Sequence, residues 1–257
     1  MEFAEHRPYQ PGDDLRFLDW KVAARADRWL LKQFEEETNL RATIVLDVSR
    51  SMDWQGAPTR LTKAAYASHL VAALTRILLR QRDAVGLVRF DDEIRTALPP
   101  RSNQQQGHRI IAALEEPGGG QGSDAAGALA RAGALVTRRG MVVLVSDLLL
   151  DPDEVDATVR GLRAQGHDVT VLHLLDPAER RFDLPQGEST FVDPEGGAAE
   201  RAIPAEVRTL YASTVGEVLD EWRARCAAVG ASYEPVLTDQ PFALPLRRAF
   251  AARQRHP

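Results

Sequence analysis

Three short oxygen-bearing side chains occur at alternate positions directly after an apolar run in the stretch IVLDVSRSM. They are Asp47, Ser49 and Ser51. A further carboxylate, Asp147, follows another apolar run in VLVSDLLLD, and Ser123 lies in the glycine-rich stretch GGGQGSD. Carboxylate and hydroxyl oxygens without histidine or cysteine suit a hard cation, of which Mg²⁺ fits best and Ca²⁺ and Mn²⁺ are the alternatives. If the fold brings these five residues together, they can form a divalent metal site.

Short apolar runs predict the strands that must position these oxygens. Most of the runs are continuous rather than alternating, which is typical of strands covered on both faces. Helical patterns separate the runs, and the clearest has apolar residues three and four apart. The predicted strands are residues 42–46, 84–90, 141–145, 169–175 and 232–237, and the predicted helices are residues 60–82, 124–137, 151–165 and 204–229.

This alternation predicts an α/β fold with a doubly wound, mostly parallel central sheet and helices on both faces. Residues 84–90 and 94–98 are joined too tightly for a crossover helix, so they predict an antiparallel strand at the sheet edge. Residues 29–37 and 41–46 suggest a second hairpin. Ligands of open parallel sheets lie beyond the carboxyl ends of the strands, which places Asp47 and Asp147 at one rim.

Composition and charge exclude several classes of protein. The formal charge of −5 over 257 residues leaves no electrostatic footprint for a nucleic acid. No apolar stretch reaches the length of a transmembrane helix and the first residues lack a signal core, so we expect a cytoplasmic protein. The single cysteine, Cys226, excludes an internal disulfide and a cysteine-based zinc site. Residues 176–203, rich in proline, glycine and acidic residues, predict a surface insertion.

Two stretches resemble known families. The pattern DVSRS at 47–51, with a hydroxyl in a later glycine-rich loop and an aspartate after a later strand, resembles the metal-ion-dependent adhesion site of von Willebrand factor A domains. The stretch RPYQPGDDLRFLDWKVAARADRWLLKQFEEE (7–37) is similar to the bacterial domain of unknown function 58 family, often encoded beside MoxR-type AAA+ ATPases. The resemblance implies a family-specific segment (1–40) packed on a von Willebrand factor A-like domain (41–257). Because the similarity begins almost at the first residue, we also expect that an upstream segment is missing.

The resemblance implies a role for each candidate ligand. The three serines would bind the ion directly, and Asp47 and Asp147 would bind it directly or through waters. The adhesion site usually has threonine in its second loop, where this chain has Ser123, and the neighbouring Asp124 is a competing candidate. The implied function is a non-catalytic, metal-dependent interaction module that grips an acidic side chain of a partner. The implied partner is a MoxR-type AAA+ ATPase, acting with it in chaperone-like assembly or activation of client proteins.

Other interpretations of the same residues stay open. A metal-dependent phosphoester hydrolase could use Asp47 as its nucleophile, but Ser49 stands where such enzymes have a second aspartate, and the only candidate lysine is Lys63. There is no G-x-S-x-G elbow and no G-x-x-x-x-G-K-[ST] loop, so we do not expect catalysis. The fold could also act as a scaffold without a metal. Taken singly, Ser51 could cap a turn and Ser123 a helix.

Overall fold

A computed structural model of the chain describes residues 2–10, 13–14, 18–20, 22–23, 29–35, 40–119, 124–182, 187, 189–191 and 200–253. The chain separates into two compact units, Met1–Asn39 and Leu40–Pro257. The expected packing of residues 1–40 on the larger domain stays a prediction. Within the described residues, no helix is long and apolar enough to cross a membrane.

The larger unit is built on a six-stranded sheet with the order β10-β7-β6-β3-β4-β5. Five of these strands are parallel, and only β5 runs antiparallel, at the edge beside β4. The mostly parallel sheet and its antiparallel edge strand confirm the predicted α/β architecture. The strands are β3 (Arg41–Asp47), β4 (Ala84–Phe90), β5 (Ile94–Arg101), β6 (Met141–Ser146), β7 (Asp168–Leu175) and β10 (Ser232–Leu237).

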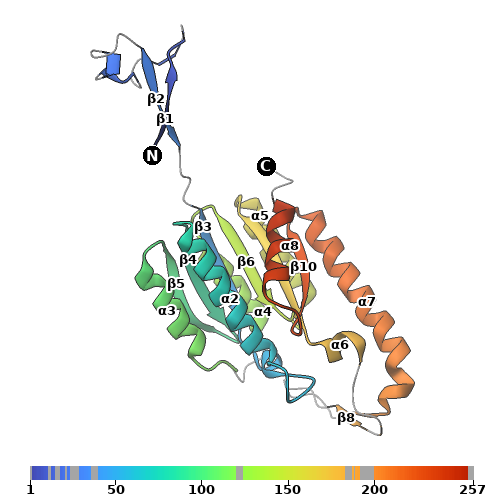
Figure 1. Cartoon of the computed structure of the whole chain (residues 1–257). Helices are drawn as coiled ribbons and strands as arrows, with labels where there is room; N and C mark the ends of the chain where they lie inside the picture. The colour runs from blue at the N-terminus through green and yellow to red at the C-terminus, as the bar shows by residue number, and fades with distance from the viewer. Residues whose placement is uncertain are drawn as a thin grey trace. The chain divides into compact units, whose positions relative to one another are not determined.

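Helices cover both faces of this sheet (Figure 1). One core joins the sheet to α2 (Lys63–Arg80), α3 (Gln104–Glu115) and α8 (Ala243–Arg253). The other core joins it to α4 (Ala125–Ala134), α5 (Pro152–Ala164) and α7 (Pro204–Ala228). The central strand β6 is buried along its whole length, which is why its sequence is continuously apolar instead of alternating.

Capping residues set where the helices begin. Thr62 accepts a hydrogen bond from the backbone of Ala65 (3.1 Å), so α2 starts at residue 63 and not at 60 as predicted. Leu61, which the sequence placed on the apolar stripe of this helix, precedes it and is 41% exposed. Asp151 caps α5, whose first residue is Pro152, a position where the missing N–H costs nothing.

The two predicted hairpins have different outcomes. The antiparallel pair β4 and β5 is confirmed, and Asp91 holds its turn by accepting from the backbone of Glu93 (3.1 Å). The predicted hairpin between residues 29–37 and 41–46 is wrong. In the smaller unit, β2 (Leu30–Glu35) pairs instead with β1 (Glu2–Pro8). The neighbours of β3 in the sheet are β4 and β6, which leave it no free edge.

Several elements were not predicted from the sequence. They include α3, α8, and three short elements inside the predicted surface insertion. These are α6 (Pro177–Arg181) and the antiparallel pair β8 (Ser189–Phe191) and β9 (Glu200–Ala202). The insertion therefore begins with a short helix, and Glu179 on that helix reaches the candidate site described next.

Candidate functional site

The candidate site lies where the strand order of the sheet reverses. From β3 the chain proceeds to β4 and β5 on one side, and β6, β7 and β10 follow on the other. This switch point between β3 and β6 is the usual ligand position of such sheets. The parallel register pairs Leu46 with Val145, so Asp47 and Ser146 follow side by side. The Ser146 hydroxyl donates to Oδ2 of Asp47 at 2.6 Å.

The loop after β3 gathers Ser49 and Ser51 beside Asp47. The backbone N–H of Ser49 donates to Oδ1 of Asp47 at 2.9 Å. A 3₁₀ turn, η2 (Arg50–Asp53), then brings the Ser51 hydroxyl within 3.1 Å of the Ser49 hydroxyl. All three residues are buried. The structure therefore brings together the three oxygen-bearing residues of the first loop, as the alternate spacing in the sequence suggested.

The Asp47 carboxyl group is electrostatically unusual. Burial raises the pKa of Asp47 to about 7, and the negative charge of Asp147 adds to this effect. The hydrogen bonds from Ser146 and Ser49 lower the pKa, but they do not outweigh burial. Two carboxylates near each other in a buried place are unfavourable when both are ionised. A cation at this rim would relieve that repulsion.

Asp147 follows β6 directly and is part of a buried ion-pair cluster. The Lys63 ammonium group donates to Oδ2 of Asp147 at 2.8 Å and to Oε1 of Glu179 at 2.6 Å. Burial lowers the pKa of Lys63, but the charges of the two carboxylates outweigh this, and the pKa of Lys63 lies above its ordinary value. Leu148 adopts a left-handed conformation (φ 54°) and donates its N–H to the Ser146 hydroxyl at 2.9 Å.

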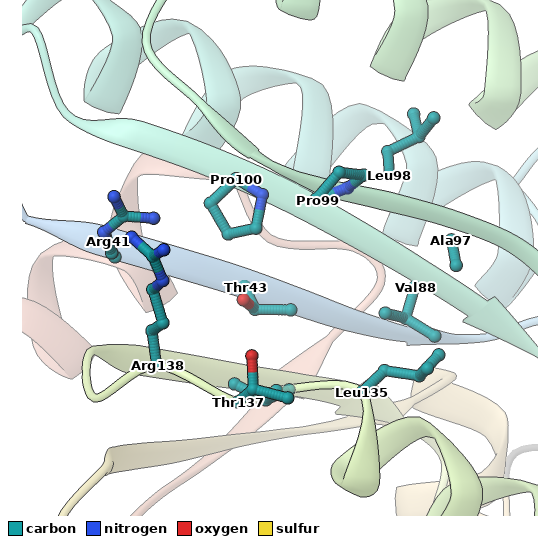
Figure 2. Close-up of a pocket in the computed structure, with 11 residues that line it drawn as sticks. Arg41, Thr43, Val88, Ala97, Leu98, Pro99, Pro100, Leu135, Thr137 and Arg138 are labelled. Carbon is teal, nitrogen blue, oxygen red and sulfur yellow. The ribbon is translucent and has the colours of Figure 1, made fainter.

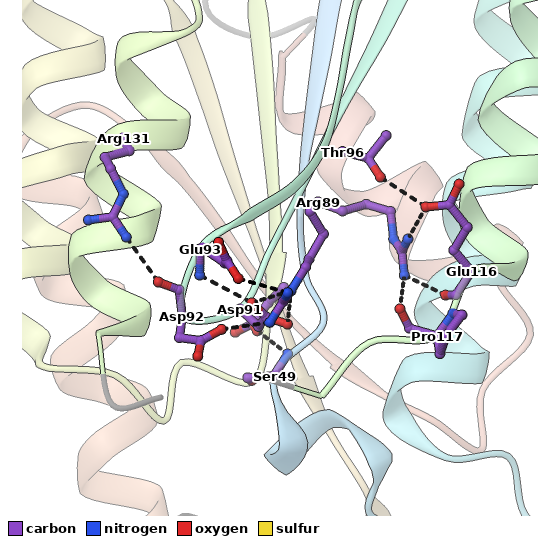
Figure 3. A network of polar contacts seen from close by, with 11 residues as sticks. Ser49, Arg89, Asp91, Asp92, Glu93, Thr96, Glu116, Pro117 and Arg131 are labelled. Atoms are coloured by element: carbon purple, nitrogen blue, oxygen red, sulfur yellow. Dashed lines mark hydrogen bonds and ion pairs between the residues drawn. The ribbon is translucent and has the colours of Figure 1, made fainter. Parts of the chain in front are cut away.

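The glycine-rich loop approaches the site through backbone contacts. The N–H of Gly119 donates to the Val48 carbonyl at 2.7 Å, and a Cβ atom added to Gly118 would lie 2.5 Å from that carbonyl. The buried Arg89 side chain holds the start of this loop by donating to the carbonyls of Glu116 (2.6 Å) and Pro117 (3.3 Å) (Figure 3). The first and second loops are therefore in direct contact at the rim.

The second-loop ligand is less defined. Ser123 lies outside the described residues, so its expected role stays a prediction. The competing candidate, Asp124, precedes α4 and pairs with Arg131 at 2.8 Å, with most of its side chain exposed. In the hairpin beside the loops, Arg95 pairs with Asp91 at 2.6 Å and with Asp92 at 2.9 Å, so these two acidic residues hold the turn.

Three polar residues at this rim were not predicted as part of a metal site, although Lys63 was considered as a catalytic lysine. Ser146 could have been found, because it is in register with Asp47 once β3 and β6 are paired. Lys63 had a weaker signal. It lies three residues before the buried Tyr66, on the face of α2 that packs into the protein, where a charged side chain needs a partner. Glu179 had none, since it lies in a short helix 116 residues from Lys63.

The chemistry of the gathered side chains fits a hard divalent cation. Two serine hydroxyls are adjacent, and two carboxylates interact electrostatically. Within the described residues, no group of three or more histidine, cysteine or acidic side chains could hold a metal, so the serines are essential to any such site. Burial lowers the pKa of His173 to about 4, so its ring is neutral, and its Nδ1 atom contacts the Tyr233 hydroxyl at 2.7 Å.

Removing the charge of Lys63 should destabilise the fold strongly. Lys63→Met leaves the buried carboxylate of Asp147 without its partner, and breaking such a pair costs about 3–5 kcal/mol in the free energy of unfolding. We expect the double variant Lys63→Met with Asp147→Asn to recover part of this loss, because only the carboxylate of Glu179 then lacks its Lys63 partner. Urea unfolding measures both values. Equal stability of Lys63→Met and the unmodified protein would contradict the ion-pair cluster.

The raised pKa of Asp47 predicts a pH dependence of stability. The unfolded chain releases this proton near the ordinary pKa of 3.8, whereas the folded chain keeps it until about pH 7. The folded state therefore binds more protons between these values, and its stability decreases as the pH rises through this window. In metal-free buffer, we expect Asp47→Asn to remove a pH-dependent loss on the order of 2–4 kcal/mol. Thermal unfolding of both proteins from pH 4 to pH 8 tests this, and identical profiles would contradict it.

Comparison with known proteins finds relatives that match nearly the whole chain. Uncharacterized proteins of Mycobacterium tuberculosis and Mycobacterium bovis are each 29% identical over 259 residues, covering 99% of this chain and 80% of theirs.

Similar folds occur in solved structures. An aerotolerance-related membrane protein of Bacteroides fragilis has a TM-score of 0.51 and 17% identity, covering 84% of this chain and 99% of that one. The pilus adhesin SpaC of Lactobacillus rhamnosus GG has a TM-score of 0.54 and 12% identity, covering 86% of this chain and 31% of that one. These structures share the fold. The family described as "Protein of unknown function DUF58" matches residues 5–217, and the chain belongs to this family.

Proposed function

We propose that this protein is a non-catalytic interaction module that binds a divalent cation, preferably Mg²⁺. Through this cation it would bind an acidic side chain of a partner protein. The ligands would be those of the metal-ion-dependent adhesion site that the sequence resembles: Asp47, Ser49, Ser51, Ser123 and Asp147. The family resemblance suggests a MoxR-type AAA+ ATPase as partner. We place this activity in the cytoplasm, in chaperone-like assembly or activation of client proteins.

One observation carries this proposal. The hydroxyls of Ser49 and Ser51 lie 3.1 Å apart at the switch point of the sheet, beside the buried Asp47 carboxyl group, whose pKa the charge of Asp147 raises. Neutral hydroxyl ligands leave a cation strongly electrophilic, so an acidic side chain of another protein is a suitable further ligand. This chain supplies the oxygens and holds them in place.

The charge of the surroundings also suits a divalent ion. Ionised Asp47, Asp147 and Glu179 carry three negative charges, and Lys63 offsets one of them, because its ammonium group contacts Asp147 and Glu179. The remaining charge of two matches Mg²⁺. Lys63 also occupies one oxygen of Asp147. This arrangement favours the weaker, water-mediated role for Asp147 and direct contact for the serines.

No observation favours the hydrolase alternative. Asp47 would have to attack a phosphorus atom, but its side chain is fully buried, and both of its oxygens accept hydrogen bonds, from Ser49 and Ser146. Lys63, the candidate catalytic lysine, is held by two carboxylates. A metal-free scaffold differs from our proposal only in its response to Mg²⁺, which can be measured directly.

Binding of Mg²⁺ should raise the melting temperature of the full chain. At a free concentration 100 times the dissociation constant, a bound ligand adds about 2.7 kcal/mol, or roughly 5–10 °C for a domain of this size. We expect the double variant Ser49→Ala with Ser51→Ala to lose this shift, and Ser102→Ala, at an exposed serine outside the site, to keep it. A shift of equal size in all three proteins, or none in the unmodified one, would contradict the metal site.

Capture of the cognate MoxR-type ATPase should depend on the site. EDTA also removes Mg²⁺ from the nucleotide of the ATPase, so the comparison is best made between variants at constant Mg²⁺. We expect the unmodified protein to retain the ATPase and Asp47→Ala to lose most of it, with Ser102→Ala as the control. If Mg²⁺ raises the melting temperature but recovery of the ATPase is equal for all variants, the metal site stands and the metal-bridged contact is wrong.

A further inference from the structure

A hollow of ≈ 500 Å³ opens on the α4 face of the sheet, at the amino end of β3 (Figure 2). Its floor is formed by Thr43 of β3 and Val88 of β4, both buried. Ala97 and Pro100 of β5 form one wall, and the segment after α4, residues 135–138, forms the other. The volume is in the range of pockets that hold small molecules.

The hollow exists because α4 is short. A helix of 10 residues is about 15 Å long, whereas a strand of 7 residues such as β4 extends about 23 Å. Helix α4 begins beside the candidate metal site and ends at Ala134, before it reaches the amino ends of the strands it covers. The part of the sheet around Thr43 and Val88 therefore has no helix above it. The exposed side chain of Leu135 lies at the margin of this gap.

The charge at one end of the hollow is positive. Arg41 and Arg138 both line this end of the hollow (Figure 2). Neither makes an ion pair or a side-chain hydrogen bond with any residue that the structure describes, and the side chains that line the hollow include no acidic residue. Two guanidinium groups that have no carboxylate partner among the described residues and line one end of a hollow are suited to bidentate binding of a carboxylate or a phosphate.

We propose that this hollow binds a small amphiphilic anion. Its carboxylate or phosphate head pairs with Arg41 and Arg138, and its apolar body lies against Val88, Ala97 and Pro100. The site is independent of the proposed cation site, because β3 runs from Arg41 to Asp47 and separates the two by about 20 Å. The two ends of one strand thus carry binding sites of opposite charge preference.

The composition of the wall argues for a compact ligand rather than a strand-like peptide. A peptide that adds to a sheet needs free backbone donors along the edge strand. At this point β5 carries Pro99 and Pro100, which have no N–H group. A nucleic acid is equally unsuited, because two arginines are a small footprint on a chain with a formal charge of −5.

Titration of the isotope-labelled full chain with octanoate, followed by NMR, tests the proposal. We expect saturable shifts of the backbone amides of Thr43, Val88 and Ala97. Octyl phosphate tests the phosphate head in a parallel arm, and whichever head binds more tightly identifies the class of ligand. Octylammonium has the same apolar body with the opposite charge, and we expect no saturable shifts with it. Equal shifts from octanoate and octylammonium would overturn the proposal, because the arginines would then have no role.

Three variants separate the head from the body of the ligand. Replacing both arginines, Arg41→Gln with Arg138→Gln, should weaken octanoate binding about tenfold or more, because two charge-assisted contacts are lost. Arg109→Gln removes one charge at an exposed position of α3, outside the hollow, and should leave binding unchanged. Ala97→Phe fills the hollow from the exposed edge strand and should abolish binding with the arginines still present. Unchanged affinity in the double arginine variant or in Ala97→Phe would overturn the assignment.

Discussion

The parallel pairing of β3 with β6 is the constraint on which the candidate site depends. Both strands lie in the interior of the sheet, and their register sets Leu46 opposite Val145. Because the strands end together, Asp47 and Ser146 emerge side by side and Asp147 follows at the same rim. Chain segments 99 residues apart thus share a hydrogen bond of 2.6 Å. The apolar cores on both faces hold this register, so the position of the polar groups is a consequence of hydrophobic packing.

Two polar arrangements share this rim and have different physical roles. The hydroxyls of the first loop contact each other and lie beside a carboxyl group that burial makes reluctant to ionise. The second arrangement is the ion-pair cluster of Lys63, which joins the start of α2 to the end of β6 and to α6. The cluster neutralises part of the acidic charge and connects three segments that are remote in sequence. The loop hydroxyls, by contrast, contact each other and belong to the proposed cation site.

The sequence predicted what depends on local pattern. Continuous apolar runs identified the four interior strands because burial on both faces removes the polar alternation, and the tight connection at 91–93 identified the antiparallel edge. Helix α3 was missed because it opens with three glutamines and buries few apolar side chains. The pairing of β2 was wrong because adjacency in sequence does not reveal a partner at residues 2–8. The partners of Lys63 lie 84 and 116 residues away, and no local pattern indicates contacts of that range.

The backbone of the second loop packs directly against that of the first loop, where Gly118 lies beside the Val48 carbonyl. No side chain separates the two backbones there, and even a methyl group would lie 2.5 Å from the carbonyl oxygen. Contact between the loops is thus part of the fold, which would limit the entropy that binding of the proposed cation has to remove. A substitution at position 118 would then alter the affinity of the proposed site, although glycine offers no side-chain oxygen.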